Sequence, residues 1–327
     1  MKGWSFKRID ELGKVITGKT PSSDYPDEFG EEYPFITPTD IPSTQKTVRV
    51  ERFISEKGKE SHRRILLPHK TTCVVCIGAT IGKACMTQRP SFTNQQINSI
   101  IVDKENDKDY VYYIATTLKD ALVSFAGGAA TPIVNKSAFS SIKVNIPSLP
   151  IQRKIAAVLS AYDDLIENNK RRIAILEKMA EELYHEWFVR LRFPGHEKVK
   201  IIKGVPDGWD VKKIGDSVIV TMGQSPSSDF YNQDGIGLPF NQGVGTYGKR
   251  FPNKEVFCSE MGRIAEKGDI LISVRAPVGR LNIADCKMII GRGLAAFKHK
   301  KGHNSYLYYP YNDTCSATSN AASFRFR

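Results

Sequence analysis

Residues Gly13–Thr20 fit the phosphate-binding loop pattern G-x-x-x-x-G-K-[ST] at every position. Such a loop needs a strand before it and a helix after it, because the helix N-terminus holds the phosphate. Here Pro21 and Pro26 follow, and proline opposes helix formation. We therefore expect a polar turn whose amides and hydroxyls face phosphate or bases, rather than a nucleotide site.

Two pairs of residues have side chains that can bind metal ions. Cys73 and Cys76 lie in Thr72–Ile77, which has the pattern of a buried strand, and residues three apart on a strand point to opposite faces. We expect both to be small buried hydrophobic residues. His299 and His303 flank a Lys-Lys-Gly turn, which is typical of a solvated loop. No metal or other cofactor is predicted.

Motifs of common catalytic sites are missing from the sequence. It has no Asn-Pro-Pro-aromatic segment of the kind found in amino-methyltransferases, no nucleophile elbow and no zinc-protease histidine pair. We therefore predict a non-catalytic protein. There is no run of eighteen apolar residues, so no membrane span is expected, and six cysteines without a secretory signal favour a reduced, cytoplasmic setting.

An internal repeat is the most informative feature of the sequence. Residues 3–9 and 18–25 match residues 208–214 and 223–230 at an offset of 205. At an offset of 197, Lys70–Lys83 aligns with Lys267–Arg280, and at an offset of 196, Tyr110–Tyr113 matches Tyr306–Tyr309. Residues 310–327 do not resemble residues 114–131, so we expect the second copy to be incomplete.

A long amphipathic segment separates the two copies. Apolar residues recur every three or four positions over 151–191, with no interior proline or glycine, which predicts one continuous helix about 60 Å long. Its stripe should pack on another long helix, and a buried Asn169 could fix the register. The expected packing residues are Ile155, Leu159, Tyr162, Ile166, Asn169, Ile173, Leu176, Leu183 and Trp187.

The predicted fold class is α+β, with two repeated mixed α/β domains separated by a long helix of coiled-coil type. The domain boundaries are 1–146, 147–195 for the spacer helix, and 196–327. Strands are expected at 72–77 and 97–102, with counterparts at 269–274 and 293–298. A helix is expected over 110–125, ended by Gly127-Gly128.

Polar, basic loops occur at equivalent places in the two copies. The net charge is +12, of which residues 196–327 carry +7, and this balance favours a polyanionic partner. Amide, hydroxyl and guanidinium groups read base edges, whereas lysine, arginine and backbone amides hold phosphates. The candidate DNA-binding residues are Lys19, Thr20, Ser22, Thr37, Thr39, Thr80, Lys83, Asn94, Gln95, Gln96 and Lys136 in the first copy, and Gln224, Ser225, Lys249, Arg250, Arg275, Arg280 and Arg292 in the second.

Four segments of the sequence, taken together, resemble the specificity subunit of type I restriction–modification systems. They are the Gly-Trp start of each copy, the Gly-Lys-Thr-Pro-Ser turn, the Gly-Ala-Thr-Ile-Gly-Lys turn, and the helix opening Pro-Ser-Leu-Pro-Ile-Gln-Arg-Lys-Ile-Ala-Ala-Val-Leu. The resemblance covers about residues 3–309. It implies that each domain is a target recognition domain reading half of a bipartite double-stranded DNA site. The helix would dock the methyltransferase (modification) subunits, and the restriction/translocase subunit would join through the complex.

Two departures from this picture stay open. Family members normally have a second long helix packed antiparallel on the first, and we expect this second helix to be missing here. Two copies of the chain could instead self-associate through their single helices and read a palindromic target. Alternatively, the helix could be a scaffold between domains that bind no DNA.

Overall fold

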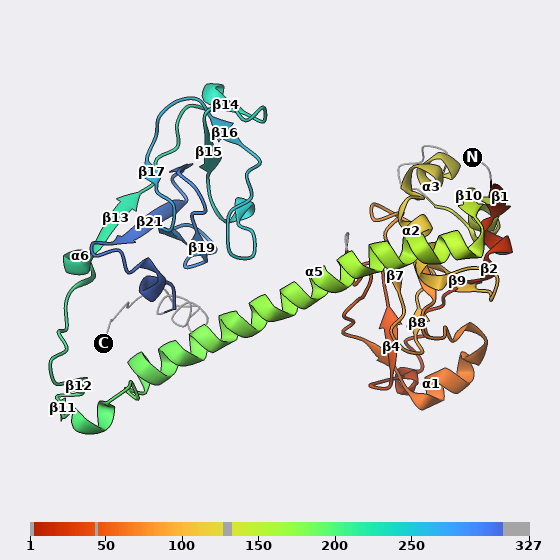
Figure 1. The fold of residues 1–327 in the computed structure, drawn as a ribbon, viewed down its shortest axis with the longest axis horizontal. Coiled ribbons are helices and arrows are strands. Elements are labelled where there is room, and N and C mark those ends of the chain that lie inside the picture. The colour runs from red at the N-terminus through yellow and green to blue at the C-terminus, as the bar shows by residue number, and fades with distance from the viewer. Residues whose placement is uncertain (1–2, 43–44, 127–132, 310–327) are drawn as a thin grey trace. The chain divides into compact units, whose positions relative to one another are not determined.

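The computed structural model describes residues 3–42, 45–126 and 133–309. The chain divides into two compact units, residues 1–173 and 174–327, and helix α5 runs across the boundary (Figure 1). No helix in the described part of the chain is long and apolar enough to cross a membrane.

The main sheet of the first unit is antiparallel and has the strand order β2-β9-β6-β7. Its strands are β2 (Gly13–Thr17), β6 (Thr72–Val75), β7 (Ala84–Met86) and β9 (Ile97–Val102). β-Branched residues are frequent in β6 and β9, and nearly every residue of these two central strands is buried on one face or the other. The strands predicted at 72–77 and 97–102 are confirmed, the first ending two residues early.

A second sheet of short strands has the order β3-β5-β4-β8, in which β4 and β8 run parallel. Its strands are β3 (Phe29–Gly30), β4 (Tyr33–Ile36), β5 (Phe53–Ile54) and β8 (Phe92–Thr93). Helix α1 (Glu56–Ser61) follows β5 and is capped by the Ser55 hydroxyl, which accepts from the Gly58 amide. Separately, β1 (Trp4–Arg8) pairs antiparallel with β10 (Lys143–Pro147).

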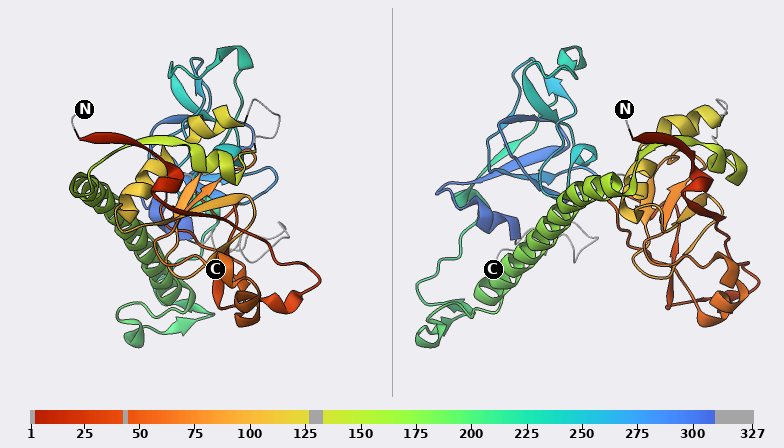
Figure 2. Two further views of the ribbon diagram at one scale, coloured as in Figure 1. Left: turned by 90° about the vertical axis from the view of Figure 1, so that its right-hand side faces the viewer. Right: turned by 45° about the vertical axis from the view of Figure 1, so that its right-hand side comes forward.

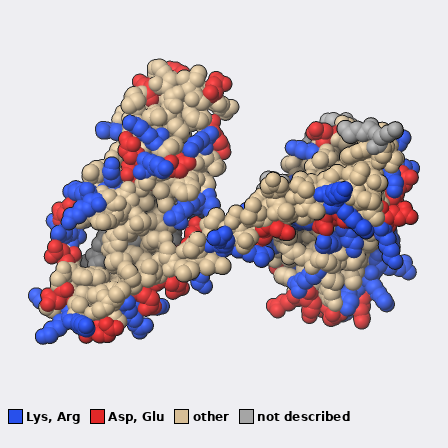
Figure 3. All heavy atoms as spheres, viewed as in Figure 1, with Lys and Arg blue, Asp and Glu red and all other residues tan. Residues whose placement is uncertain are grey.

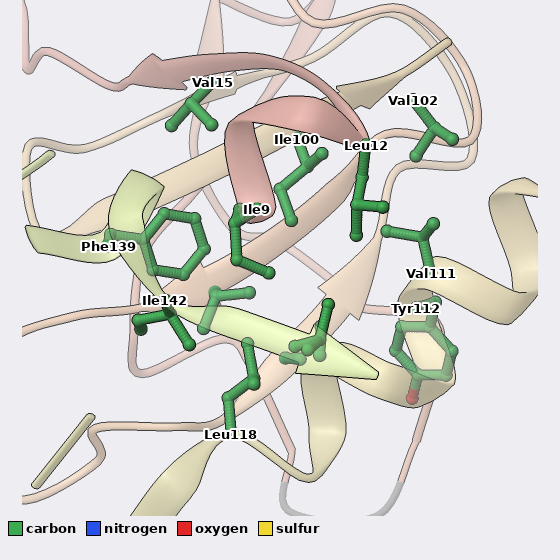
Figure 4. Close-up of a cluster of buried hydrophobic side chains, with 14 of the residues drawn as sticks. Ile9, Leu12, Val15, Ile100, Val102, Val111, Tyr112, Leu118, Phe139 and Ile142 are labelled. Atoms are coloured by element: carbon green, nitrogen blue, oxygen red, sulfur yellow. The ribbon is translucent and has the colours of Figure 1, made fainter. Parts of the chain in front are cut away.

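Three helices complete the first unit: α2 (Lys108–Thr116), α3 (Lys119–Phe125) and α4 (Lys136–Ser141). Side chains from α2, α4 and the main sheet meet in the largest core of the unit, where Leu12, Ile100 and Phe139 are completely buried (Figure 4). Burying such side chains away from water is the main force that holds the layers together.

The prediction of one helix over 110–125 is wrong, because α2 and α3 are separate helices. Thr116 and Thr117 lie at the break, and their hydroxyls donate to the carbonyls of Tyr113 (2.7 Å) and Ile114 (2.8 Å). Such bonds compete with the helical ladder, and β-branched residues add little helix propensity. The predicted stop at Gly127-Gly128 lies outside the described residues.

The second unit repeats the main sheet and the small sheet of the first, with one further strand, β17, in the small sheet. Its main sheet has the order β13-β21-β18-β19, and its small sheet has the order β14-β16-β15-β20-β17 with β15 and β20 parallel. The strands are β13 (Val218–Met222), β14 (Tyr231–Asn232), β15 (Leu238–Asn241), β16 (Phe257–Cys258), β17 (Ile264–Ala265), β18 (Ile270–Ser273), β19 (Leu281–Ile283), β20 (Met288–Ile290) and β21 (Leu294–His299). The hairpin β11 (Ile201–Ile202) and β12 (Val205–Pro206) and the short helix α6 (Ile214–Ser217) precede them. The sequence repeat is thus a repeat of topology.

The structure corrects the alignment of the repeat by one residue along β18. In the first unit Val75 is the partner of Ile97, and in the second unit Ser273 is the partner of Leu294. Val75 therefore corresponds to Ser273, at an offset of 198 rather than 197, because the turn after β18 is one residue shorter. The prediction that the second copy stops after Tyr309 concerns residues that lie outside the described part of the chain.

Helix α5 (Leu149–Tyr184) continues into a π-helical turn, His185–Val189, and is one uninterrupted rod (Figures 1 and 2). The predicted continuous helix over 151–191 is confirmed to within two residues at each end. Much of the apolar stripe is bare in this single chain. Leu159, Tyr162, Ile166, Ile173, Leu176 and Leu183 are 39–64% exposed, and Asn169 is exposed as well. Packing on a second long helix stays a prediction.

The first turns of α5 are fixed to the first unit by a buried amide. Gln152 accepts from the Asp107 amide (2.9 Å) and donates to Asn106 Oδ1 (3.2 Å) and to the Pro147 carbonyl (3.0 Å). Beside it, Ala156 is buried and Ile155 packs half-buried against the same core. Ile155 therefore contacts the first unit rather than standing free for a partner helix.

One turn further, a half-buried charge network joins α5 to α2. Asp109 accepts from Lys46 and from Lys70 (2.8 Å), and Lys46 also donates to Ser160 on α5 (3.4 Å). The Tyr113 hydroxyl donates to Asp163 of the helix (2.6 Å). Burial raises the pKa of Asp109, but the hydrogen bonds from the two lysines outweigh it and hold that pKa below its usual value.

The other end of α5 packs within the second unit through aromatic rings. Phe188 lies 5.0 Å from the ring of Tyr306 and 5.8 Å from that of Trp209, and Tyr184 lies 5.9 Å from Tyr306. Offset and edge-on aromatic contacts of this kind stabilise by about 0.5–1.5 kcal/mol each beyond the area they bury.

We expect Gln152→Ala to lower the free energy of unfolding of the first unit by about 2–4 kcal/mol, because three buried backbone and side-chain groups lose their partner. Denaturant unfolding monitored by circular dichroism measures this change. The exposed Gln88→Ala variant is the matched control. Equal stability of the two variants would contradict the role given to Gln152.

We expect Asp109→Asn to cost about 1–2 kcal/mol at neutral pH, since two charge-assisted hydrogen bonds are weakened. A carboxyl whose pKa is lower in the folded state stabilises above its unfolded pKa of about 4, and this contribution is lost as the pH falls through the folded value. The difference between wild type and variant should therefore shrink below pH 4 in denaturation curves. A difference that is constant from pH 7 to pH 3 would argue against the network.

Candidate nucleic-acid interface

Loops of the first unit are joined to one another where the strands of its two sheets end. The Gly18 amide donates to the Ile97 carbonyl (3.2 Å), and the Lys19 amide donates to the Thr93 carbonyl (2.9 Å). A Cβ at Gly18 would lie 2.2 Å from the carbonyl oxygen of Thr93, so only glycine permits this approach. The loop after β2 is thereby held against the loop between β8 and β9.

Two more loops join the same place. The Asn94 amide donates to the Ile36 carbonyl (3.1 Å) at the end of β4, and the Cys76 amide donates to the Gln96 carbonyl (2.8 Å) at the end of β6. We call these joined segments, residues 18–22, 36–41, 76–83 and 93–97, the first loop cluster.

Three predicted residues meet directly in this cluster. The Thr20 hydroxyl donates to Gln95 Oε1 (2.7 Å), and among the described residues none accepts from the Gln95 amide nitrogen. Lys19 and Gln95 are exposed. Asn94 and Gln96 bond to each other instead, through Asn94 Nδ2 to Gln96 Oε1 (3.2 Å), and both are half-buried.

Other predicted residues of the cluster are engaged in its internal structure. Thr37 is buried and donates to Asp40 through both its amide and its hydroxyl (2.7 Å each), which leaves Thr39 as the exposed residue of that turn. Lys83 donates to the Ile41 carbonyl (3.2 Å) and so fastens two loops together. Ser22 donates to Asp24 (2.9 Å).

The remaining two predicted residues of the first unit are Thr80, within the cluster, and Lys136, on an adjoining segment. Thr80 is half-buried in the turn between β6 and β7. Lys136 is exposed at the start of α4, two residues after Val134, whose amide donates to the Cys76 carbonyl (2.9 Å). The segment that leads into Lys136 is therefore bonded to the start of the 76–83 turn.

The second unit contains the same junction. The Gly223 amide donates to the Leu294 carbonyl (2.9 Å) and the Gln224 amide donates to the Ile290 carbonyl (3.0 Å), which are the counterparts of the Gly18 and Lys19 bonds. The Val274 amide donates to the Gly293 carbonyl (2.9 Å). We call residues 223–226, 241–243, 274–280 and 291–293 the second loop cluster.

The charged side chains of the second loop cluster are three arginines, Arg275, Arg280 and Arg292. The Ser225 hydroxyl accepts from the Arg292 amide (3.2 Å), which brings these two predicted residues together beside Gln224. Arg275 and Arg280 bracket the turn after β18, and Gln224, Arg275, Arg280 and Arg292 are all exposed.

Lys249 and Arg250 are engaged elsewhere. Both pair with Glu177 on α5, at 3.4 Å each, and the Arg250 guanidinium lies 5.2 Å from the ring centre of Tyr308. Lys249 and Arg250 therefore bind the end of α5 within the second unit. The interface proposed below does not include them.

The motifs that suggested nucleotide or metal binding are part of the main sheet and its core. Gly13–Thr17 is strand β2, so this segment cannot wrap a phosphate as a loop, in agreement with the prediction against a nucleotide site. Cys73 and Cys76 belong to two different core clusters on opposite faces of the sheet, as their spacing predicts. Burial raises the pKa of the Cys76 thiol to about 11, so it stays protonated.

Sequence reasoning missed a group of arginines beside the first loop cluster. Arg49, Arg52 and Arg89 are exposed, and Arg49 and Arg89 border a groove of about 310 Å³. The signal in the sequence was Arg49 between Val48 and Val50, where alternation along an extended segment puts the arginine on the side opposite the two valines.

Comparison with known proteins follows the same division of the chain. The family profile described as "Type I restriction modification DNA specificity domain" matches residues 1–178. The "Type I restriction enzyme MjaIX specificity subunit" of Methanocaldococcus jannaschii is 35% identical over 249 residues, which are 73% of this chain and 57% of that protein. The HindI specificity subunit of Haemophilus influenzae is 35% identical over 180 residues, 52% of this chain and 38% of that protein.

A solved structure shares the fold. The S subunit of a type I restriction–modification system from M. genitalium superposes with a TM-score of 0.57 at 18% identity, covering 95% of this chain and 78% of that one. The chain thus spans little more than half of the length of the MjaIX subunit and most of the M. genitalium chain. Because the family profile covers more than half of the 327 residues, the chain belongs to the family of type I restriction–modification specificity proteins.

Proposed function

We propose that this chain is the DNA-recognition subunit of a type I restriction–modification complex. Residues 1–146 and 196–327 act as target recognition domains and residues 147–195 as the spacer helix. The observation that carries the proposal is the repeated junction: two loop clusters, built by equivalent backbone hydrogen bonds, each present exposed amide or basic side chains. A bipartite DNA site needs two such reading surfaces.

Each cluster divides the work between phosphates and bases. Lys19 is exposed on a backbone-anchored loop and contacts phosphate, while Gln95, oriented by Thr20, offers its amide to a base edge. In the second unit Arg292 contacts phosphate and Gln224 offers its amide to a base edge. Lysine and arginine side chains are spread over both units, mixed with acidic ones, and the chain has a net charge of +12 (Figure 3).

The partners follow from the helix. The bare stripe of α5, including Leu159, Leu176 and Leu183, offers an apolar surface for the helices that complete the complex. Modification subunits dock along it and supply methylation, and the restriction subunit joins through them. The chain itself contributes recognition and no catalytic group.

We expect Lys19→Ala to weaken DNA binding by a similar factor on all sequences, because a phosphate contact carries no sequence information. Gln95→Ala should instead reduce the preference for the target over random DNA, by about 1–3 kcal/mol at one base pair. Fluorescence anisotropy with target and random duplexes, using the complex with modification subunits, measures both quantities.

Lys104→Ala is the control for charge, since Lys104 is exposed in the turn after β9, at the opposite end of that strand from the loop cluster. If wild type binds no DNA in a salt-dependent way, alone or in the complex, the chain is a helical scaffold and the proposal fails. If it binds but neither Lys19→Ala nor Gln95→Ala has an effect, the cluster is not the reading surface.

A second candidate function is favoured by the exposure of the stripe. Two copies of the chain can bury the stripe by pairing their α5 helices antiparallel. Across the two-fold axis, residue i of one copy contacts residue j of the other, and residue j of the first contacts residue i of the second. Such a homodimer would carry two identical first units and would read a spaced palindrome.

For this candidate, Leu176→Asp should convert a dimer into a monomer, because it places a charge in the middle of the stripe, where Leu176 is 61% exposed in the single chain. Sedimentation of the purified chain gives the mass. Asn168→Asp, which adds the same charge off the stripe, should remain dimeric. A monomeric wild type would remove self-association and leave the modification subunits as the occupants of the stripe.

A further inference from the structure

Arg49 and Arg89 border an open groove on the first unit that the predicted site residues do not include. The groove has a volume of about 310 Å³. Its walls and floor are formed by Pro34, Ile36, Val48, Arg49, Val50, Phe53, Gln88, Arg89 and Ser91. Its lining thus combines apolar side chains with two arginines.

The guanidinium groups at this groove are available to an anion. Arg89 lies 5.7 Å from the ring centre of Phe53, and the neighbouring Arg52 lies 5.3 Å from that of Phe35. Stacking on a ring fixes a guanidinium while leaving its N–H groups pointing outward. In the part of the chain that the structure describes, no carboxylate pairs with Arg49, Arg52 or Arg89.

The segment that carries Arg49 is held at both ends. On one side the Lys46 carbonyl accepts from the Met86 amide (2.8 Å), and the Lys46 ammonium is held by Asp109. On the other side the Arg52 carbonyl accepts from the Phe35 amide (2.9 Å). The groove is therefore formed before any ligand arrives, which reduces the entropy cost of binding.

The groove is continuous with the first loop cluster. Ile36 lines the groove, and its carbonyl accepts from the Asn94 amide of the cluster (3.1 Å). Ser91 also lines it and lies two residues before Thr93, whose carbonyl holds Lys19. The groove and the first loop cluster thus share the same backbone framework.

We propose that this groove binds the sugar–phosphate backbone of one DNA strand, just outside the bases that the first loop cluster reads. The inference rests on the proposed function of that cluster. Phosphates accept from Arg49 and Arg89, and the half-buried Val48 and Val50 contact deoxyribose. Because no base edge is touched, the contact strengthens binding to all sequences equally and fixes the register of the duplex.

The test is the salt dependence of DNA binding by the complex with modification subunits. Each neutralised phosphate contributes about −0.9 to the slope of log K against log salt, so Arg49→Ala/Arg89→Ala should reduce the magnitude of that slope by about 1.8. Between 50 and 200 mM salt the double variant should lose about tenfold less affinity than wild type. The ratio of affinities for target and random duplexes should stay unchanged.

Lys104→Ala/Lys143→Ala is the matched control, because it also removes two exposed positive charges from the first unit. Its slope should equal that of wild type. Equal slopes for the groove variant and the control, in a wild-type complex that does bind DNA, would overturn the groove proposal and leave the proposed function standing. A groove variant that no longer assembles with the modification subunits would overturn it in favour of a protein ligand. Absence of DNA binding by wild type would overturn both.

Discussion

The two units depend on one requirement, that backbone groups at the ends of buried strands find hydrogen-bond partners. In the first unit the strands of both sheets stop at about the same place, and their loops satisfy one another: Lys19 bonds to Thr93, and Asn94 bonds to Ile36. The second unit solves the same problem with Gln224 and Ile290. A rigid platform results, and the side chains on it are free to differ between the units.

This separation of backbone from side chains explains how one topology can serve two recognition surfaces. The bonds that build each junction use amides and carbonyls, which every residue carries, and the close approach needs a glycine at position 18 and at position 223. Lys19 in one unit and Gln224 in the other occupy equivalent positions with different chemistry. A target with two different halves calls for this arrangement, and loops on a rigid scaffold are where binding residues concentrate.

The long helix has different tasks at its two ends and along its middle. At its start, Gln152 and the network around Asp109 tie it to the first unit with polar bonds. At its end, Phe188 packs against aromatic rings in the second unit. Between these ends many of its apolar side chains, such as Ile166 and Leu176, stay half or more exposed, and burying them in an assembly would be favourable.

The sequence by itself determined the repeat, the long helix, the central strands and the burial of Cys73 and Cys76 on opposite faces. These follow from periodicity, which local geometry enforces over many residues. It also placed Lys19, Gln95, Gln224 and Arg292 in loops, because turn residues and charges are legible without contacts. It could not divide those loops into exposed and engaged residues.

Tertiary structure alone decided that division. Lys83 and Arg250 look like free cations in the sequence, yet the Ile41 carbonyl holds one and Glu177 on a distant helix pairs with the other. The groove bordered by Arg49 and Arg89 likewise forms because two segments forty residues apart in the chain come together. Such pairings depend on which strands become neighbours, and long-range register is not contained in any local pattern of residues.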